Sequence, residues 1–459
     1  MNPARPVQVE SQRLPSGGAV MYDPCESMVI PTGATVSVNL CWGQQWAWQQ
    51  QEMPPDRRSP SLIFTCVMSL PEQTRLGDVQ AALRMVTARH AALRSTVSAG
   101  PGRPPQSVVW SAEADGYDLA RFDDREHGER WLRDQMDIGA SWPLRVAVLG
   151  RGPMRLGIAA HHIASDRYGF DLLCRELRLA LRATLRRTTP PLPPVGRQPA
   201  DIAAFERSAA GAAVSRRAIE YWLDHRAELD VAVCVLGARF DTTSGAMHVA
   251  RAVSVDAKTS LSTLATAAHS SEASVAVAAI ASVLAGHLGT QTVPFYLTSA
   301  NRHLTGLKHS VCSVAQAGLA SVSVPAPNDL PRLVPAASKA TLAALSHAYY
   351  DGSALAERAR AAGGPGPHPP VSPPSINILH SDDSSPPGGG HGLPATAHTT
   401  RADRPCLGLN FHVRLTTASV SVELRAGTHL LSASECRELV AGTLRLLLDA
   451  SPATVHIVR

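Results

Sequence analysis

Lysine and aromatic residues are scarce in this 459-residue chain. Among 43 basic residues, the only lysines are Lys258, Lys308 and Lys339, and Phe, Trp and Tyr together make up 5% of the sequence. The arginines are scattered, with "RATLRR" the nearest approach to a cluster. Nucleic-acid-binding proteins concentrate positive charge and interleave aromatic side chains with it. The composition therefore argues against a nucleic-acid partner. The net charge of +5 leaves an acidic protein surface as the partner that a mildly basic chain would favour.

Long apolar runs and paired cysteine motifs are missing as well. The first residues, "MNPARPVQVESQRLPSGG", contain no apolar signal core, and no segment reaches the roughly 18 apolar residues needed to cross a bilayer. The eight cysteines show no C-x-x-C spacing, and most stand among apolar residues, as buried reduced thiols do. We therefore expect a cytoplasmic protein without membrane contact.

Several common catalytic signatures are absent. The sequence has no G-x-S-x-G elbow, no P-loop, no H-E-x-x-H and no G-x-G-x-x-G followed by the expected acidic residue. These absences argue against an α/β-hydrolase, a P-loop nucleotide hydrolase, a zincin protease and a Rossmann dinucleotide enzyme.

The composition is that of a globular chain, with 44% hydrophobic and 18% charged residues. Its length exceeds the size at which single cores stop growing, so we expect two domains. The Pro-rich stretch "TTPPLPPVGRQP" (188–199) is the best linker. We predict an N-terminal extension over residues 1–36, an N-terminal lobe over 37–190 and a C-terminal lobe over 191–459. Pro/Gly-rich insertions are expected near 363–396.

Strands and helices alternate in the N-terminal half. Residues 61–70 and 154–162 are apolar strand candidates. Between them, apolar residues recur at steps of four and three from Val79 to Leu93, which predicts one face of a helix. Residues 170–187 repeat this helical spacing.

The C-terminal half shows a similar order. "AIEYWLDHRAEL" and "SVAVAAIASVLAGHLG" indicate helices, and "VPFYLTSANR" and "INIL" indicate strands. The chain ends in two strand patterns, "LNFHVRL" and "SVSVEL", and a helix with Ser432 or Ser434 near its cap. We therefore expect two α/β lobes, although no internal repeat is visible.

Two adjacent histidines, His161 and His162, end the strand 154–162, and Asp166 follows before the next helix. Successive strand side chains point to opposite faces, so the pair cannot share one ligand or one proton transfer. Zinc sites favour histidines one helical turn apart or Cys/His clusters, which makes a metal site a poor interpretation. Two structural histidines remain an alternative. A strand-to-helix junction is, however, a common place for catalytic groups, and this favours a catalytic site.

At this point "HHIASDRYGFDLL" resembles the HHxxxDG motif of the condensation domains of nonribosomal peptide synthetases, which is shared in part by the chloramphenicol acetyltransferase superfamily. Other segments resemble family motifs in the same order along the chain. They are "CWGQQWAW", "RHAALRSTV", "QPADIAAFERS" with "EYW", and "TSANRHLTGLKHSVCSVAQAGLASV". The resemblance covers about residues 38 to 455.

The resemblance implies an α/β fold in which two chloramphenicol acetyltransferase-like lobes form a V-shaped pseudo-dimer with a central tunnel. Carrier proteins would present acyl groups on phosphopantetheine arms, and the chain itself would bind no cofactor and no metal. No adenylation, thioesterase or carrier segment is recognised, so we expect a free-standing, monomeric condensation enzyme of natural-product biosynthesis. It would join a carrier-bound acyl thioester to an amine or, as the second choice, a hydroxyl.

The motif also implies roles for individual residues. His162 matches the histidine that takes a proton from the nucleophile, or orients it, during acyl transfer. His161 matches the histidine that faces the core and hydrogen-bonds locally. Asp166 matches the structural aspartate, and Arg302 in "SANR" is its expected ion-pair partner.

The sequence departs from the family at the motif itself. Arg167 stands where the family has glycine, and Tyr168 and Gly169 follow where it has Trp-Ser. We predict that these three residues form an acceptor or oxyanion site. Cys312 or Ser313 also stands where a glycine of the tunnel floor is expected. Two interpretations follow, a polar or anionic acceptor that pairs with Arg167, or a weakened activity.

Three alternatives stay open. The chain could be a catalytically retired condensation-like domain that recruits carrier proteins or tailoring enzymes, or an acyl-CoA-dependent acyltransferase. An epimerase of the same fold is disfavoured, because such domains adjoin a carrier domain.

Overall fold

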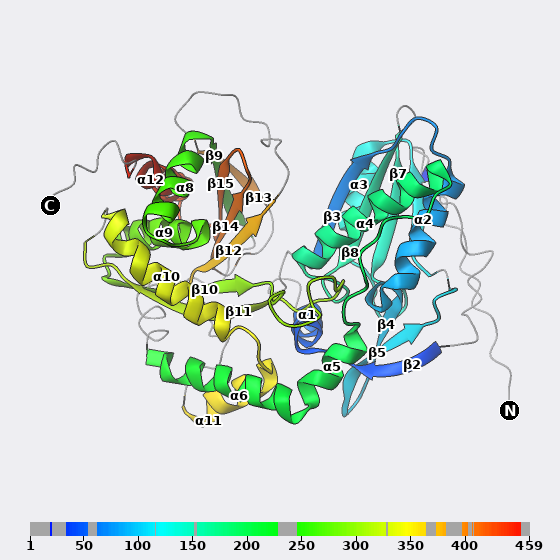
Figure 1. Ribbon diagram of the computed structural model, residues 1–459, viewed down its shortest axis with the longest axis horizontal. Coiled ribbons are helices and arrows are strands. Elements are labelled where there is room, and N and C mark those ends of the chain that lie inside the picture. Colours follow the sequence, from blue (N-terminus) through cyan, green and yellow to red (C-terminus); the bar gives the residue numbers. More distant parts are fainter. Residues whose placement is uncertain are drawn as a thin grey trace. The chain divides into compact units, whose positions relative to one another are not determined.

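The computed structural model describes residues 19–20, 34–53, 62–114, 116–150, 154–227, 246–326, 329–363, 373–381, 397–402, 406 and 408–450. These residues form two compact units, each with its own large sheet (Figure 1). Two sheet-containing units of mixed α/β structure confirm the predicted fold class. The predicted extension over 1–36 and the insertions near 363–396 lie largely outside the described residues. The V-shaped arrangement and the tunnel stay predictions.

The two units do not follow the sequence in two uninterrupted stretches, as the predicted lobes do. The first unit contains Met1–Leu40, Ser61–Asp201 and His309–Ser313, and the second contains Cys41–Pro60, Ile202–Lys308 and Val314–Arg459. The short segment 309–313 joins the first unit because it packs on the linker: Gly196 N donates to His309 O at 3.1 Å. A side chain at Gly196 would meet Ser310 N at 2.6 Å, so only glycine allows this approach.

A five-stranded sheet in the order β1-β6-β7-β8-β3 forms the frame of the first unit. The β6–β7 pair is parallel and the other pairs are antiparallel. A second sheet of three strands has the order β2-β5-β4. The strands are β1 (Ala19–Val20), β2 (Ala34–Asn39), β3 (Ile63–Ser69), β4 (Ser95–Gly100), β5 (Arg103–Trp110), β6 (Asp118–Phe122), β7 (Leu144–Leu149) and β8 (Arg155–His161).

Helices cover the five-stranded sheet of the first unit, whose strand β8 is buried on both faces. Its residues Leu156, Ile158 and Ala160 join the apolar cluster that includes helices α2 (Leu76–Arg89) and α4 (Arg167–Arg186). Helix α3 (Arg125–Arg133) packs on the other face, where Gly157 makes room for it. A Cβ at Gly157 would lie 2.4 Å from Leu132 Cδ1, so strand and helix could not approach in this way with another residue.

The predicted helices of the first unit form, with shifted ends. Helix α2 ends at Arg89 because His90 is extended, with φ −117° and ψ 99°, and the 3₁₀ helix η2 (Ala91–Arg94) follows. The predicted apolar face still reaches the core, since both His90 and Leu93 are fully buried. Helix α4 begins at Arg167, three residues before its predicted start, because Asp166 caps it.

The second unit is built on a seven-stranded sheet in the order β11-β10-β12-β14-β15-β9-β13. Helices α8, α9, α10 and α12 pack with this sheet around one apolar core (Figure 1). The elements are β9 (Met247–Ser254), α8 (Asp256–Ala267), α9 (Glu272–Leu288), β10 (Thr292–Ser299), β11 (Gln316–Ser323), α10 (Leu330–Ser346), β12 (Ser375–His380), β13 (His398–Ala402), β14 (Leu409–Leu415), β15 (Val420–Gly427) and α12 (Ala433–Asp449). Ser432 is the N-cap of the last helix, and all the strands and helices predicted over this region are present.

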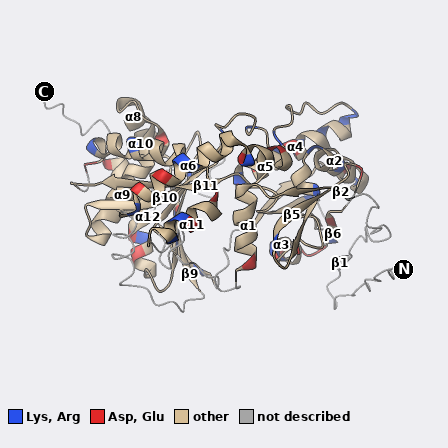
Figure 2. Cartoon of the chain, turned by 90° about the horizontal axis from the view of Figure 1, so that it is seen from below, with Lys and Arg blue, Asp and Glu red and all other residues tan. Residues whose placement is uncertain are grey.

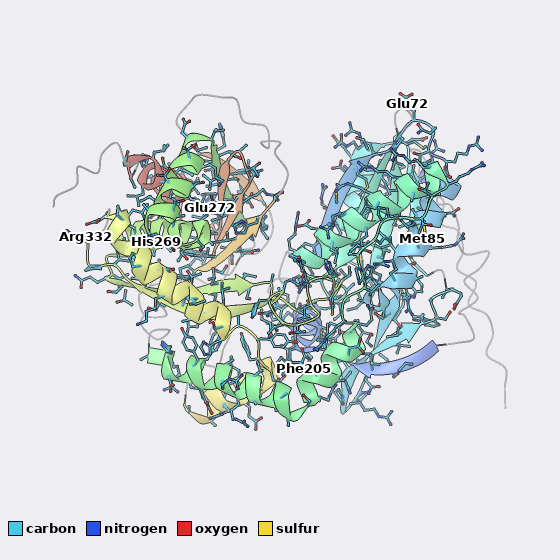
Figure 3. All side chains as sticks on the ribbon, in the orientation of Figure 1. Glu72, Met85, Phe205, His269, Glu272 and Arg332 are labelled. Carbon is cyan, nitrogen blue, oxygen red and sulfur yellow. The ribbon has the colours of Figure 1, made fainter. Side chains whose placement is uncertain are left out.

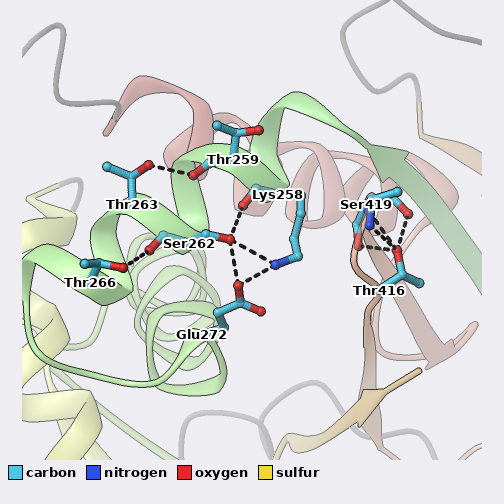
Figure 4. A network of polar contacts seen from close by, with 9 residues as sticks. Lys258, Thr259, Ser262, Thr263, Thr266, Glu272, Thr416 and Ser419 are labelled. Atoms are coloured by element: carbon cyan, nitrogen blue, oxygen red, sulfur yellow. Dashed lines mark hydrogen bonds and ion pairs between the residues drawn. The ribbon is translucent and has the colours of Figure 1, made fainter. Parts of the chain in front are cut away.

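A polar network fixes the bend between α8 and α9. Ser262 Oγ donates to Glu272 Oε1 at 2.6 Å, and Lys258 Nζ donates to Ser262 Oγ at 2.9 Å and also pairs with Glu272 (Figure 4). Glu272 lies in the first turn of α9, where its negative charge interacts favourably with the positive end of the helix dipole (Figure 3). In the described part of the chain, no single helix is long and apolar enough to cross a membrane, although α8 and α9, bent by 108°, pass that test as a pair.

Four further helices lie in the described part of the chain. They are α1 (Trp42–Glu52), α5 (Pro199–Arg207), α6 (Ala209–Asp224) and α11 (Gly352–Ala361). Helix α6 begins earlier than predicted because Ser208 caps it, with its hydroxyl accepting from Gly211 N at 3.2 Å. Lys and Arg occur on elements of both units, as the scattered arginines of the sequence predict (Figure 2).

A buried glutamate explains why α1 groups with the second unit. Glu206 Oε2 accepts from Trp42 N at 2.9 Å, and Glu206 Oε1 accepts from Tyr349 Oη–H at 2.6 Å. The rings of Trp42 and Tyr349 also pack, with centroids 4.9 Å apart. All three side chains are buried. These contacts tie the first turn of α1 to α5 and to the segment before α11.

Candidate functional site

His161 is the last residue of β8 and lies in the core of the first unit, 1% exposed. Its backbone N–H donates to Pro143 O at 3.0 Å. Its ring Nδ1 accepts from Ile163 N at 3.0 Å, so a neutral ring carries its proton on Nε2. The imidazole therefore holds the turn after the strand in place.

His162 follows the strand end and stays partly exposed. Its backbone N–H donates to Leu62 O at 2.7 Å, and its ring Nδ1 lies 3.1 Å from Ser313 Oγ. The ring of Phe64 on β3 packs beside it, with centroids 5.0 Å apart. The imidazole is thus held on one side by a hydroxyl and on the other by an aromatic ring.

Burial lowers the pKa of His162, and the Asp166 carboxylate and a backbone hydrogen bond oppose this only in part. The neutral imidazole therefore dominates at neutral pH. When Nδ1–H donates to Ser313 Oγ, Nε2 keeps its lone pair and can accept a proton. The arrangement suits a general base.

Asp166 is the N-cap of α4 and is fully buried. Its carboxylate accepts from Gly169 N at 2.9 Å, and its own N–H donates to Cys312 O at 3.5 Å. Capping satisfies an otherwise unpaired amide of the first helical turn and favours the helix dipole. Asp166 therefore fixes the position where the histidine turn becomes a helix, and segment 309–313 packs on this turn.

Arg167, the residue that replaces the motif glycine, occupies the first position of α4. Its side chain forms a double contact with Asp171 one turn later: Nε to Oδ2 at 3.0 Å and Nη2 to Oδ1 at 3.0 Å. The Arg167 side chain is 33% exposed and the Asp171 side chain 55%. The guanidinium charge is therefore already paired with a carboxylate of the same helix.

The other two residues of the predicted acceptor site differ from each other. Tyr168 is 40% exposed, whereas Gly169 is buried. The Gly169 N–H donates to Asp166 and is therefore committed to the helix cap. The predicted acceptor or oxyanion role of residues 167–169 stays a prediction.

Arg302 lies after β10, in the second unit, and donates from Nη1 to Ala300 O at 2.8 Å. The preceding Asn301 holds this segment, since its Nδ2 donates to Val314 O at 2.8 Å and to Ala348 O at 3.0 Å. Asp166 belongs to the first unit. The predicted ion pair between Asp166 and Arg302 stays a prediction.

A buried ionic cluster joins α4 to the end of α2. Glu176 Oε2 on α4 lies 2.9 Å from His90 Nε2 and 3.1 Å from Arg89 Nε at the end of α2. Arg89 Nη2 also donates to Pro193 O at 2.6 Å. Burial alone would raise the pKa of Glu176, but its contacts with His90 and Arg89 outweigh burial and lower it. The segment that resembled a family motif, "RHAALR", therefore anchors both α4 and the linker.

Sequence reasoning did not identify Ser313 and Phe64 as neighbours of His162. Ser313 is 151 residues away in the chain, and only its place in the expected floor motif signalled it. Phe64 was visible only as one apolar residue of a predicted strand. Among the described residues, no group of three or more His, Cys, Asp or Glu side chains could hold a metal ion.

Comparisons with known proteins agree with this geometry, although no profile of a known protein family matches the sequence. The chain is 29% identical over 160 residues to the nonribosomal peptide synthetase TES of Alternaria alternata, covering 33% of this chain and 3% of that protein. It is 27% identical over 208 residues to the phosphinothricin tripeptide synthetase PhsB of Streptomyces viridochromogenes, covering 43% and 17%. The chain therefore spans a small part of these relatives.

Solved structures match nearly the whole chain. The condensation domain that mediates chain release from the enacyloxin polyketide synthase covers 93% of this chain and 86% of its own, with TM-score 0.68 and 20% identity. The first condensation domain of the calcium-dependent antibiotic synthetase, in complex with a substrate analogue, covers 91% and 97%, with TM-score 0.67 and 18% identity. The X-domain in complex with OxyB from teicoplanin biosynthesis covers 91% and 94%, with TM-score 0.67 and 18% identity. The chain therefore has the fold of the condensation domains.

Proposed function

We propose that this protein is an acyltransferase that joins a carrier-protein-bound acyl thioester to an amine, with a hydroxyl as the second choice of nucleophile. The observation that carries the proposal is the environment of His162. The imidazole is partly exposed and has a lowered pKa, and its Nδ1 lies 3.1 Å from Ser313 Oγ, so the proposal assigns the role of base to the other ring nitrogen, Nε2. The fold and the peptide-synthetase relatives favour a role in natural-product biosynthesis.

In this proposal His162 handles the proton of the nucleophile. The amine nitrogen attacks the carbonyl carbon of the thioester, and Nε2 accepts the proton that the nitrogen releases. The carbon–sulfur bond then breaks, and the imidazolium returns the proton to the departing sulfur. An amide and a thiol result. The backbone N–H of Arg167 is the proposed donor to the carbonyl oxygen while it carries negative charge.

The contacts of Arg167 bear on whether the unusual motif preserves activity. Its side chain pairs with Asp171 on the exposed side of α4, which supports a backbone role rather than a direct pairing with an anionic acceptor. The carboxylate cap of Asp166 remains in place despite the missing glycine. Both observations favour an active site over a retired one.

A recruiting module is the second candidate function. The likeness to the X-domain that was solved in complex with OxyB supports it, because that domain is in a complex with another protein. In this alternative, a carrier protein or a tailoring enzyme would bind without any role for the His162 imidazole.

The partners and location follow from the proposed reaction. Acyl groups would arrive on the phosphopantetheine arm of a carrier protein, so no cofactor bound by this chain is needed. We propose that the protein acts in the cytoplasm as a single chain. The reduced character of its six described cysteines, which carry thiols and not disulfides, supports this location.

A single-turnover experiment tests the proposal. Acyl-loaded carrier protein is mixed with candidate amines and alcohols, and product is followed by mass spectrometry for the wild type and for His162→Ala. We expect product with the wild type and a loss of about 10²-fold or more in rate with the variant. Circular dichroism checks that the variant is folded, and Ser141→Ala, at a partly exposed serine outside the site, is the control.

The other functions give different results in the same assay. Equal carrier binding by the wild type and His162→Ala, with turnover by neither, would support the recruiting module. Turnover with free acyl-CoA and without carrier would support a CoA-dependent acyltransferase. An unchanged rate in His162→Ala would contradict the proposed role of the imidazole.

A further inference from the structure

The solvent-facing side of helix α4 carries four arginines in a row. Counted along the helix, they are three, four and four residues apart, so their side chains lie on one face. All four are exposed, whereas the opposite side of α4 is buried in the apolar core of the first unit. An α-helix rises about 1.5 Å per residue, so the row is roughly 17 Å long. We call it the arginine face, and it consists of Arg175, Arg178, Arg182 and Arg186.

Carboxylates do not balance this positive charge. Helix α4 has two acidic residues, Asp171 and Glu176. Asp171 pairs with Arg167 at the start of the helix. Glu176 is buried and contacts Arg89 and His90 at the end of α2. Among the residues that the structure describes, no carboxylate lies within ion-pair distance of the arginine face, so its four charges are available to a partner.

Helices α3 and α12 balance their arginines with acidic neighbours. On α3, Glu129 pairs with Arg125 and Arg133, each one turn away. On α12, Asp449 stands four residues after Arg445. Opposite charges at this spacing stabilise a helix and leave little net charge for a partner. The charge of α4 is therefore a local feature and does not follow from the arginine-rich composition of the chain alone.

The arginine face is unfavourable for the isolated helix. Arg178 and Arg182, and likewise Arg182 and Arg186, are four residues apart, and like charges at this spacing destabilise a helix. Arg178 Nη2 lies 3.8 Å from Cys66 Sγ, which places this part of the row beside β3. A partner with carboxylates would relieve the repulsion, because a guanidinium can donate two parallel hydrogen bonds to one carboxylate.

We propose that the arginine face is a docking surface for an acidic protein, in particular for a helix that carries Asp or Glu at the same three- and four-residue spacing. Charge complementarity carries the inference. A nucleic acid is disfavoured, because α4 has no aromatic residue for base stacking between Asp171 and Arg186. An anionic membrane is disfavoured, because most apolar side chains of α4 are buried in the core and cannot insert into lipid. The proposal does not depend on the chemistry proposed for His162.

Fluorescence anisotropy with a designed peptide tests the docking surface in the full chain. The probe is a labelled helical peptide with four glutamates at the spacing of the arginine face, and its control peptide has glutamines in their place. We expect the protein to bind the glutamate peptide more tightly, and the difference to shrink as salt is added. Equal binding of the two peptides, or no binding of the glutamate peptide, would overturn the proposal.

Substitutions on α4 locate the binding. Arg175→Gln combined with Arg182→Gln should weaken binding of the glutamate peptide by about tenfold or more, because two charges are removed from the row. Arg437→Gln combined with Arg445→Gln is the matched control, since both residues are exposed on α12, and it should bind as the wild type does. Unchanged affinity in the α4 variant, or an equal loss in both variants, would contradict a specific role of the arginine face.

Charge reversal and competition distinguish the kinds of partner. Arg175→Glu combined with Arg182→Glu should bind a matched lysine peptide more tightly than the wild type does, because the row then carries negative charge as well. Vesicles that contain phosphatidylserine and a single-stranded oligonucleotide are added as competitors of the glutamate peptide, and we expect both to displace it only weakly. If either bound the wild type more tightly than the peptide and lost its binding in the glutamine variant of α4, the proposal of a protein partner would be wrong.

Discussion

Glu176 in the first unit and Glu206 in the second are both buried on helices, yet their pKa values shift in opposite directions. Glu176 contacts His90 and Arg89, and these contacts lower its pKa in spite of burial. Glu206 contacts two uncharged donors, the Trp42 N–H and the Tyr349 hydroxyl. Burial raises the pKa of Glu206 to about 8, and its hydrogen bonds and nearby Arg207 compensate only in part.

The difference shows that the partner, and not burial alone, sets the charge of an interior carboxyl group. In the first unit an ionic cluster holds α4, the helix whose first turn follows the histidine pair. In the second unit a carboxyl group that is mostly protonated at neutral pH holds α1. The Glu176 carboxyl group is therefore ionised at neutral pH, whereas the Glu206 carboxyl group changes its charge near pH 8.

Removing the Glu176 carboxylate should have the largest effect on the free energy of unfolding. Glu176→Ala leaves the buried His90 and the half-buried Arg89 without their carboxylate, and we expect a loss of about 3 kcal/mol in the free energy of unfolding. Chemical denaturation measures it. Glu129→Ala removes a carboxylate that pairs with exposed arginines on α3, and it should cost less than about 1 kcal/mol. If the two variants lost the same free energy of unfolding, the claim that a buried, paired carboxylate contributes more than an exposed one would be wrong.

The second carboxyl group should make stability depend on pH. Because the folded state keeps the Glu206 proton up to about pH 8 while the unfolded state releases it near its ordinary value of 4.5, stability should fall as pH rises between these values. The slope contributed by this group is at most about 1.4 kcal/mol per pH unit. Glu206→Gln should remove this contribution. We would compare denaturation of the two proteins at several pH values, and an identical dependence would show that Glu206 ionises normally.

Loss of the Tyr349 hydroxyl, which donates to Glu206, should increase the difference in pKa between the two glutamates and should destabilise the protein less than Glu176→Ala. Tyr349→Phe removes one of the two donors that favour the ionised form, so the pKa of Glu206 should rise further. We expect destabilisation of about 1 kcal/mol, measured as a shift in the denaturation midpoint, and a fall of stability that continues to higher pH than in the wild type. A fall that ends at lower pH than in the wild type would contradict the role of the hydroxyl.

The smallest effect is expected at the exposed pair on α4. Arg167→Gly restores the glycine of the motif and removes a solvent-exposed contact with Asp171, worth about 0.3–0.5 kcal/mol, and adds a glycine to the first helical turn. The variant should lose about 1 kcal/mol or less and remain folded. Acyl transfer by this variant at a rate within a few-fold of the wild type would agree with a backbone role for residue 167, and a complete loss would show that the side chain is required.

The sequence was sufficient for part of the elements but not for their grouping. Apolar periodicity located α2, α4 and β8, and the start of α4 shifted because Asp166 caps it. Helix α3 and the strands β4 to β7 were not predicted. Periodicity carries no information on long-range contacts. It could not place α1 in the second unit or segment 309–313 in the first.

The candidate site divides in the same way. The histidine pair and Asp166 are neighbours in sequence, so the motif brought them together. Ser313 contacts His162 from 151 residues away, and its place in the expected floor motif did not predict that contact. The pairing of Arg167 with Asp171 at one helical turn was readable from spacing once the helix start was known.

The central claim is that a neutral His162 accepts the proton of the nucleophile during acyl transfer from a carrier protein. The most direct test is the pH dependence of the single-turnover rate for the wild type and His162→Ala. Because burial lowers the pKa of His162, the wild-type rate should stay constant through neutral pH and fall only below its ordinary value of about 6.5. The single-turnover rate of the variant should be much lower and should not decline at acidic pH. A folded His162→Ala that transfers the acyl group with the wild-type rate and profile would contradict the account.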